Sequence, residues 1–376
     1  MTEVARNITQ FGTSRFLQGH ADLFVHQARE AGQNIGPITV VKTTTAGTRD
    51  DRVAAFNDGH GFPIRLRGYD GDKLVDDIVM VESVTAALDA NHNWEAVAEL
   101  FTRRTDIVFS NVGDSGFDFT EGDMRLPPSG SVPRSFPAKF LALLMRRFAS
   151  GARPILVLPC ELISDNGVVF RRCLLELSMA WNLPSQFLDW LTQGVTICNT
   201  LVDRIVSEAI EPVGAIAEPY GLWAIQWDGN SEFPFQHPKI ILTKELESFA
   251  RLKLHILNLG HTFLADIWKS EDRAYDETVR QILQDGAIRN RLLNLYASEI
   301  VPGFGAHDMA ERAADYVATT LHRFDNPFLN HRISDIHQNH ALKVERRMRA
   351  FIDWTLQAGY SAKASQLARI CSKYRK

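Results

Sequence analysis

The sequence predicts an α/β protein in which a doubly wound parallel sheet is followed by a mainly α-helical half. The first observation is a series of short apolar runs, each bounded by turn residues, in the amino-terminal half. The second is that amphipathic helical patterns separate these runs, as expected when helices cover both faces of a parallel sheet. The third is a change from about Thr200 onward, where long helical patterns dominate.

The predicted elements alternate along the first half. Strands are expected at 8–11, 38–41, 78–84, 107–110 and 155–158. Helices are expected at 16–30, 94–102 and 138–148. The Gly- and Pro-rich segment 113–137 is predicted to be a long loop beyond a strand end, where ligand-contacting loops usually lie.

The second half is predicted to contain four long helices, at 244–268, 276–297, 309–323 and 340–357. We expect a boundary between Thr200 and Pro238, which gives a dinucleotide-binding domain over 1–215 and a helical substrate domain over 216–376.

The bulk composition narrows the function class. The 376 residues suit two domains, and 45% hydrophobic with 23% charged residues is typical of a folded protein. A net charge of −4 gives no field that would attract nucleic acid or an acidic membrane. No apolar run reaches the length of about 18 residues that spans a bilayer, and Met1 to Arg6 lack a signal core. The four cysteines lack zinc or dithiol spacing, which indicates a reduced, cytoplasmic protein with cysteines buried as small hydrophobes.

The first predicted strand ends in a glycine and leads into a helix. Free backbone N–H groups at such a helix start can bind the pyrophosphate of a dinucleotide. The predicted contacts are Phe11, Gly12, Thr13, Ser14, Arg15 and Phe16. The Ser14 hydroxyl can also cap the helix. Because the full G-x-G-x-x-G pattern is absent, an ordinary strand-turn-helix remains an alternative.

Two further strand ends are candidate cofactor contacts. Lys42 ends the second strand, where an acid usually binds the ribose hydroxyls. A basic residue there tolerates a 2′-phosphate, so NAD is expected and NADP is the alternative cofactor. The alternative for Lys42 itself is a solvated strand end without a role in binding. Asn111 and Val112 follow the strand at 107–110 and suit contact with the nicotinamide half. A plain Asn/Asp/Gly turn is the alternative for those residues.

A lysine, an asparagine and a histidine mark the candidate catalytic helix. With about 100° per residue, Asn258 lies about 140° and His261 about 80° round from Lys253, so the three share one arc. The rest of the helix is apolar, and lysine is almost never buried without a partner or a task. Burial lowers the pKa of a lysine, so Lys253 can accept a hydroxyl proton while Asn258 and His261 stabilise the oxyanion. A snorkelling lysine with structural Asn and His residues is the alternative.

The Lys-x4-Asn-x2-His spacing of these residues resembles the signature of the polyol-specific long-chain dehydrogenase/reductase family. That family includes mannitol 2-dehydrogenase and the fructuronate and tagaturonate reductases. Further matching blocks follow in the right order: 10–17, 109–111 with Gly116, 135–139, 159–163, 200–206 and 323–327. The resemblance implies a Rossmann-like first domain, a helical second domain, a substrate in the cleft between them, and zinc-independent catalysis with Lys253 as acid/base. Within matching segments, Glu161, Arg204 and Lys343 are candidate substrate contacts.

The resemblance implies an NAD(P)-dependent enzyme that interconverts a hexitol or pentitol with its ketose. Ser14 replaces a glycine common in the family's first turn, and Leu162 stands where mannitol dehydrogenases carry an asparagine. The chain also ends before the hexuronate reductases do, which places a neutral polyol before a sugar acid. A hexuronate reductase, a polyol-phosphate dehydrogenase and a non-catalytic dinucleotide sensor are the alternatives. We expect a monomer or small homo-oligomer that binds neither nucleic acid nor membranes.

Overall fold

The computed structural model describes residues 6–44, 50–113, 115–229, 231–362 and 365–374. The N-terminal segment 1–5 and Asp114 of the predicted loop lie outside this description. The chain divides into a first unit, Met1–Leu66 with Asp76–Leu246, and a second unit, Arg67–Val75 with Glu247–Lys376. This division falls later than the predicted boundary at 215/216.

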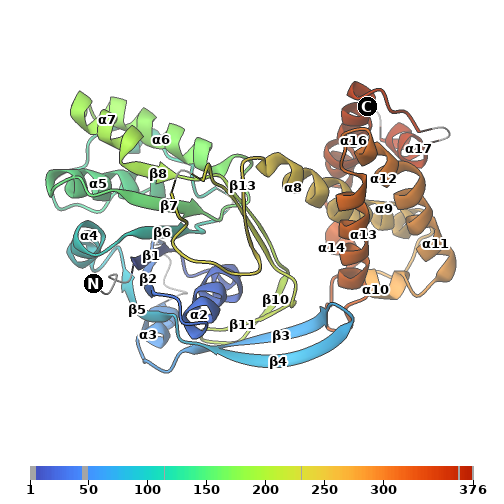
Figure 1. Ribbon diagram of the computed structural model, residues 1–376, viewed down its shortest axis with the longest axis horizontal. Helices are drawn as coiled ribbons and strands as arrows, with labels where there is room; N and C mark the ends of the chain where they lie inside the picture. The colour runs from blue at the N-terminus through green and yellow to red at the C-terminus, as the bar shows by residue number, and fades with distance from the viewer. Residues whose placement is uncertain (1–5, 45–49, 114, 230, 363–364, 375–376) are drawn as a thin grey trace. The chain divides into compact units, whose positions relative to one another are not determined.

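The centre of the first unit is a six-stranded parallel sheet with the order β5-β2-β1-β6-β7-β8 (Figure 1). The strands are β1 (Arg6–Phe11), β2 (Ile35–Lys42), β5 (Val84–Asp89), β6 (Ile107–Ser110), β7 (Ile155–Pro159) and β8 (Val195–Ile197). Phe11 pairs with Val41 on one side and Ser110 on the other, so these strands end level with one another. The strand order reverses between β1 and β6, which is where doubly wound sheets bind ligands.

Helices cover both faces of this sheet, which confirms the predicted doubly wound α/β architecture. One face carries α1 (Arg15–Leu17), the π-helical segment η1 (Gln18–Asp22), α2 (Leu23–Glu30) and α3 (Asp50–Phe56). The other face carries α4 (Trp94–Arg103), α5 (Phe136–Ala149), α6 (Asn166–Ala180) and α7 (Ser185–Gln193). Two separate apolar cores result, one against each face. The segment from 115 to 135 is loop apart from the 3-10 turn η3 (Glu121–Met124), as predicted.

Two smaller sheets complete the first unit. One has the order β10-β11-β3-β4 and the other β13-β12-β9. Their strands are β3 (Phe62–Asp70), β4 (Lys73–Val81), β9 (Thr200–Asp203), β10 (Val206–Ala209), β11 (Ala215–Ala217), β12 (Leu222–Gln226) and β13 (Ile240–Thr243). The predicted single strand at 78–84 is wrong, because it joins the end of β4 to the start of β5. Trp223 and Ile225 of β12 belong to the same core as Ile8 of β1, which explains why the first unit extends past residue 215.

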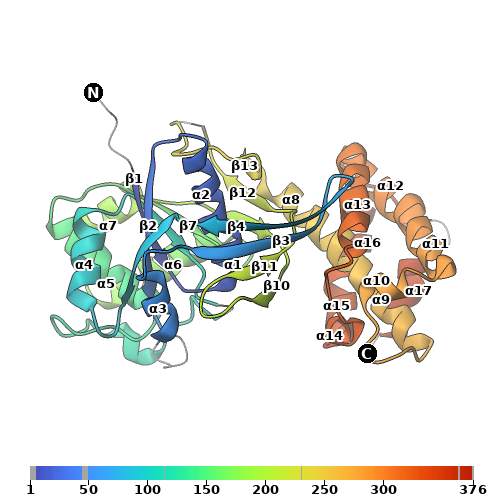
Figure 2. The same cartoon turned by 90° about the horizontal axis from the view of Figure 1, so that it is seen from below.

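The long β3–β4 hairpin is drawn from the side in Figure 2, and its tip, Arg67–Val75, groups with the second unit. The Arg67 guanidinium lies 4.0 Å from the centre of the Phe328 ring, and the Arg67 carbonyl accepts the Asn326 side-chain amide at 3.1 Å. Tyr69 meets His322 edge to face. The hairpin tip is therefore part of the packing of the second unit.

The second unit is helical, as predicted, but its long helices are interrupted. It contains α9 (Leu259–Ser270), α10 (Val279–Ile282), α11 (Gly286–Leu295), α12 (Val301–Gly305), α13 (Ala310–Phe324), α14 (Ile333–His337), α15 (His340–Val344), α16 (Ala350–Gln357) and α17 (Gln366–Lys373), after α8 (Leu246–Leu252). Three π-helical segments join neighbouring helices: η4 (Lys253–Asn258), η5 (Tyr296–Ile300) and η6 (Glu345–Arg349). Such single-turn π segments occur frequently at functional sites.

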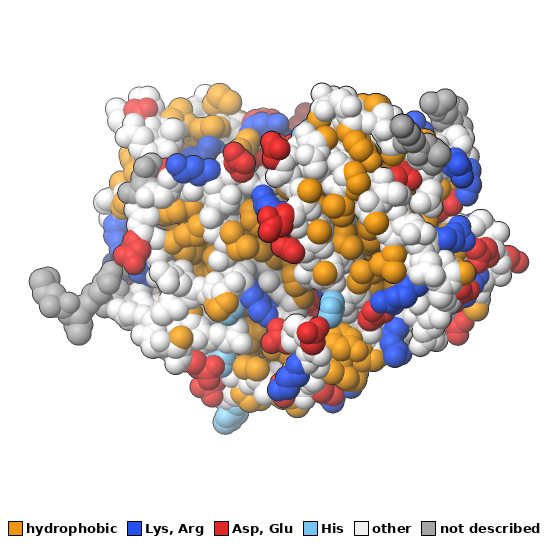
Figure 3. All heavy atoms as spheres, turned by 45° about the vertical axis from the view of Figure 1, so that its right-hand side comes forward, with side chains coloured by type: hydrophobic (Ala, Val, Ile, Leu, Met, Phe, Trp, Pro, Cys, Tyr) orange, Lys and Arg blue, Asp and Glu red, His pale blue; other side chains and the backbone are white. Residues whose placement is uncertain are grey.

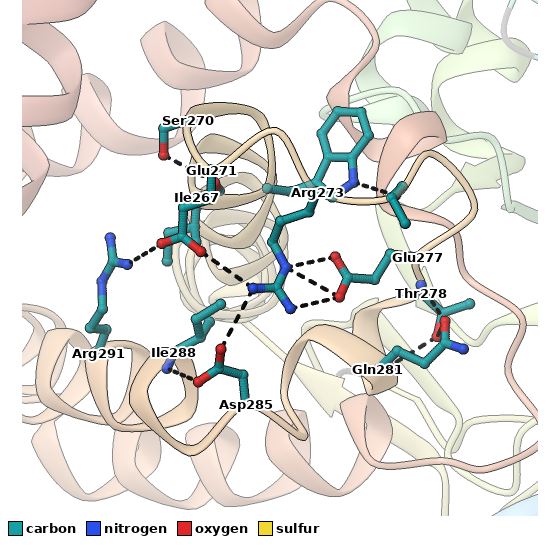
Figure 4. Close-up of polar contacts among 12 residues, drawn as sticks. Ile267, Ser270, Glu271, Arg273, Glu277, Thr278, Gln281, Asp285, Ile288 and Arg291 are labelled. Carbon is teal, nitrogen blue, oxygen red and sulfur yellow. Dashed lines mark hydrogen bonds and ion pairs between the residues drawn. The ribbon is translucent and has the colours of Figure 1, made fainter.

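The turn between α9 and α11 is held by Arg273 (Figure 4). Its guanidinium donates two bonds of 2.9 Å to Glu277 and reaches Glu271 and Asp285 at 3.3 and 3.5 Å. Glu271 in turn accepts a bond from Arg291 on α11. This network fixes the end of α9 against the following helices.

The four cysteines are buried and unbridged, as predicted. None of the helices in the described ranges is both long and apolar enough to cross a bilayer. Figure 3 shows basic and acidic side chains interspersed on one face, and among the described residues no continuous stripe of one charge is visible there.

Candidate active site

The turn after β1 brings the backbone close to the loop that follows β6. Gly12 has φ of +108°, and a Cβ at this position would overlap the carbonyl oxygen of Asn111. Only glycine therefore fits. The Ser14 hydroxyl accepts the Leu17 N–H at 3.2 Å, which confirms the predicted helix cap. The turn thus presents the start of the α1–η1–α2 helix at the point where the strand order reverses, a geometry that fits a dinucleotide pyrophosphate.

The side chains of this turn have different surroundings. Phe11 is in the core and packs against Phe136 and Phe140, so the side chain faces away from the turn. Arg15 pairs with Glu211, and the Phe16 ring stacks on that of His20 at 4.8 Å. The buried Thr13 contributes its carbonyl, which accepts the Arg52 guanidinium at 3.1 Å. The backbone of this turn, more than its side chains, therefore fits a cofactor contact.

Lys42 is not a solvated strand end. It is 2% exposed, and its ammonium lies 2.7 Å from the Asp89 carboxylate at the end of β5. Asp89 also accepts the backbone N–H of Asn91 at 2.8 Å. The acidic residue at this edge of the sheet is therefore Asp89 of β5 and not a residue of β2. It pairs with the Lys42 ammonium, whose positive charge would otherwise favour a 2′-phosphate.

A buried glutamate organises the loop after β6. Glu161, which follows β7, accepts the Ser110 hydroxyl at 3.0 Å and the Val112 N–H at 3.2 Å. Burial raises the pKa of Glu161 to about 7, although the hydrogen bonds from Ser110 and Val112 act in the opposite direction. Asn111 donates to the Cys160 carbonyl at 2.7 Å. Glu161, predicted as a substrate contact, thus positions the predicted nicotinamide-side loop in the structure.

In the second unit, the candidate catalytic residues lie at the joint between α8 and α9. Lys253 begins η4 and Asn258 ends it, and the Leu259 N–H reaches back five residues to the Leu254 carbonyl. The predicted 140° separation assumed a regular α-helix and is wrong. A π-helical turn, with bonds between residues five apart, places Lys253 and Asn258 closer together around the axis. Lys253 is half-buried, whereas a nearly all-round buried helix was predicted.

The end of η4 is fixed by a half-buried arginine. Arg347, on η6, donates to the Asn258 carbonyl at 3.1 Å and to the Thr262 hydroxyl at 3.0 Å. The Arg347 carbonyl lies 3.0 Å from Nδ1 of His255. Burial lowers the pKa of Arg347, and it lowers that of His255 to about 4. His255 therefore stays neutral and serves this contact between helices.

The third candidate, His261, is buried at the start of α9. Its ring lies 4.5 Å from that of Phe324 and 4.8 Å from that of His331. Burial lowers the pKa of His331, and Arg323 and Lys343 lower it further against an opposing effect of the exposed Asp335. Burial and the charge of Arg347 likewise lower the pKa of Lys343, whose ammonium donates to the Ile336 carbonyl at 2.6 Å. Arg347 thus contacts Asn258, and the charges of Arg323 and Lys343 act on His331, whose ring contacts His261.

Comparison with known proteins matches both units. The description "Mannitol dehydrogenase Rossmann domain" matches residues 6–240, and "Mannitol dehydrogenase C-terminal domain" matches 245–372. The chain belongs to the mannitol dehydrogenase family. It is an oxidoreductase of the polyol and sugar-acid dehydrogenase class, and the predicted family and Rossmann domain are confirmed.

Individual relatives agree with this assignment. The chain is 28% identical to an altronate oxidoreductase of Halalkalibacterium halodurans, over 95% of this chain and 72% of that protein. It is 27% identical to one of Bacillus subtilis, over 92% and 74%. In fold it is similar to a D-sorbitol dehydrogenase, with a TM-score of 0.77, 16% identity and coverage of 95% and 78%. It is also similar to Pseudomonas fluorescens mannitol 2-dehydrogenase in a ternary complex with NAD and D-mannitol, with a TM-score of 0.72, 17% identity and coverage of 99% and 79%.

Within this mannitol dehydrogenase family fold, one predicted substrate contact has another task. The Arg204 guanidinium donates to the carbonyls of Gly19, Pro219 and Tyr220, which ties η1 to the loop before β12. The sequence did not indicate that Arg347 and His331 lie at the candidate site. Both come from segments far from Lys253 in the sequence, and the structure places them beside the candidate catalytic helix.

Proposed function

We propose that this protein is an NAD-dependent dehydrogenase that interconverts an aldonate such as altronate with the corresponding keto-sugar acid. The observation that carries this proposal is a cationic group, Arg323, Lys343 and Arg347. Arg347 contacts Asn258, and the charges of Arg323 and Lys343 act on His331, whose ring contacts that of His261. A substrate carboxylate complements such a group, because charge-assisted bonds to lysine and arginine are stronger than neutral ones. The names of the altronate oxidoreductase relatives support the same substrate class.

In the proposed reaction, Lys253 Nζ accepts the proton of a secondary hydroxyl. Asn258 and His261 donate hydrogen bonds to the same oxygen as negative charge develops on it. NAD, when bound, supplies the acceptor for the hydride that leaves the carbon. In this proposal the backbone around Gly12 contacts the pyrophosphate, and the Ser110–Val112 loop, which Glu161 holds, contacts the nicotinamide side. The Lys42–Asp89 pair supports NAD over NADP.

The sequence alone placed a neutral hexitol or pentitol first, whereas the cationic group supports a sugar acid first. The test is a panel of altronate, mannonate, mannitol, sorbitol, arabinitol and mannitol 1-phosphate with NAD and with NADP, followed by NADH or NADPH absorbance. We expect kcat/KM for an aldonate to exceed that for the matching polyol by roughly 10- to 100-fold, the value of one charge-assisted hydrogen bond. Equal use of a neutral hexitol would exclude the sugar-acid assignment.

A single substitution tests whether Lys343 causes the preference for the aldonate. Lys343→Met should remove most of the preference for the aldonate while leaving kcat/KM for any neutral polyol within a factor of about 3. Preference for mannitol 1-phosphate would indicate that the cationic group binds phosphate, and NADH binding without turnover of any compound would indicate a dinucleotide sensor.

A further inference from the structure

Two π-helical segments pack against the catalytic one, and each contributes a polar group to its backbone. Arg347 of η6 bonds the Asn258 carbonyl, as described above. Tyr296, the first residue of η5, donates its hydroxyl to the Ile256 carbonyl at 3.0 Å. Tyr296 is 1% exposed, so this bond lies in a dry environment. Both carbonyls belong to the turn that contains Lys253 and Asn258.

The Ile256 carbonyl lies where the helical register changes. In an α-helix, each carbonyl accepts the N–H four residues later. In η4 the Leu259 N–H is shared between the Ile256 carbonyl and the Leu254 carbonyl, five residues back. Buried backbone carbonyls without a full partner are costly. The Tyr296 hydroxyl gives this carbonyl a partner from outside the helix, which favours the π register over the α register.

Gly260, four residues after Ile256, is part of the same arrangement. A Cβ on Gly260 would overlap the Tyr296 hydroxyl oxygen and would lie 3.3 Å from the Phe324 ring. Phe324 is also the ring that packs on His261. Gly260 thus leaves the space in which the Tyr296 hydroxyl reaches the helix backbone.

We propose that Tyr296 is a positioning residue for catalysis. Its hydroxyl holds η4 in the π register and so keeps Lys253 and Asn258 close together around the helix axis. This inference rests on the proposed function, in which Lys253 is the acid/base and Asn258 an oxyanion donor.

The first test compares two tyrosine-to-phenylalanine variants. Tyr296→Phe removes only the hydroxyl that bonds η4. Tyr374→Phe is the control, because its hydroxyl bonds the Asp266 carboxylate on the adjoining helix α9 at 3.0 Å instead of a backbone carbonyl of η4. In Tyr296→Phe we expect kcat to fall about tenfold, as for one hydrogen bond, with KM for the cofactor within about twofold. Tyr374→Phe should keep its kcat. An equal change in both variants, or none in Tyr296→Phe, would overturn the inference.

A double-mutant cycle tests the link to Gly260. Gly260→Ala should lower kcat by more than tenfold in the natural protein, because the methyl group displaces the hydroxyl. In the Tyr296→Phe background, the same substitution should cost at most about threefold, since no hydroxyl is left to displace. Independent, multiplicative effects would contradict the proposed arrangement.

Hydrogen exchange separates this inference from the proposed function. If the natural protein oxidises no compound of the panel, the proposed function fails, and the exchange rates of amides 256–262 still report the register. Tyr296→Phe should accelerate exchange in this segment about tenfold, and Tyr374→Phe should leave it unchanged. Unchanged exchange in Tyr296→Phe would show that the hydroxyl does not hold the turn, whatever the activity.

Discussion

Replacement of Glu161 by glutamine should make the stability of the protein less dependent on pH. Glu161 is buried beside Ser110 and Val112, and burial raises its pKa from 4.5 to about 7. The folded protein therefore binds this proton more tightly than the unfolded chain. The stabilisation is fully present below the unfolded-state pKa and is lost as pH rises through the folded-state pKa.

The size of this effect follows from the two pKa values. With a pKa of 4.5 in the unfolded chain and about 7 in the folded protein, the ionisable carboxyl group lowers the free energy of unfolding, relative to a group that stays protonated, by about 1 kcal/mol at about pH 5 and by about 3 kcal/mol at about pH 8. Glu161→Gln keeps the shape but cannot ionise. The free energy of unfolding of the variant minus that of the natural protein should thus grow by about 2 kcal/mol between about pH 5 and about pH 8.

The assay is thermal and urea unfolding of both proteins across that pH range. Glu208→Gln is the matched control, because Glu208 is exposed on β10. Asp22, whose pKa burial also raises to about 7, is unchanged in both proteins and cancels in the difference. A difference in stability that is the same at both ends of the pH range would refute a buried, titrating Glu161.

Two further predictions concern charged groups. Lys253→Ala should lower kcat by a factor on the order of 100 or more while cofactor affinity, measured by NADH fluorescence, is retained, and the exposed Lys269→Ala on α9 should keep its activity. Near-normal turnover in Lys253→Ala would remove that residue from the mechanism. Asp89→Asn should destabilise the protein by about 3 kcal/mol in urea unfolding, because the buried Lys42 ammonium loses the carboxylate that lies 2.7 Å away. Recovery of stability on adding Lys42→Met would confirm the cause, and an unaffected single variant would contradict it.

Much of the first unit could be predicted because its central strands are short, continuous apolar runs. The strand at 107–110 is found with the predicted bounds, and that at 155–158 is one residue longer. The hairpin β3–β4 was missed because β4 is an edge strand whose consecutive Asp76 and Asp77 conceal its alternation. Pairing with a neighbour, not local pattern, defines such a strand.

In the second unit, periodicity indicated helices but could not indicate their register. A π turn shifts the hydrogen bonds by one residue within an otherwise apolar stretch, so the pattern around Lys253 looks the same in both registers. Contacts from distant segments, such as Arg347 to Asn258 and Tyr296 to Ile256, decide the matter. The sequence therefore indicated which residue types form the candidate site. It did not indicate the contacts from other helices that hold them.

The β3–β4 hairpin tip affects how the protein can be divided. Residues 247–376 expressed alone would lack Arg67–Val75, and with it the cation over the Phe328 ring and the acceptor for the Asn326 amide. On the ribosome, this tip is synthesised long before Asn326 and Phe328. Its contacts with them can form only after the last third of the chain has emerged. An evolutionary exchange of the helical unit would therefore have to include the hairpin tip that packs with it.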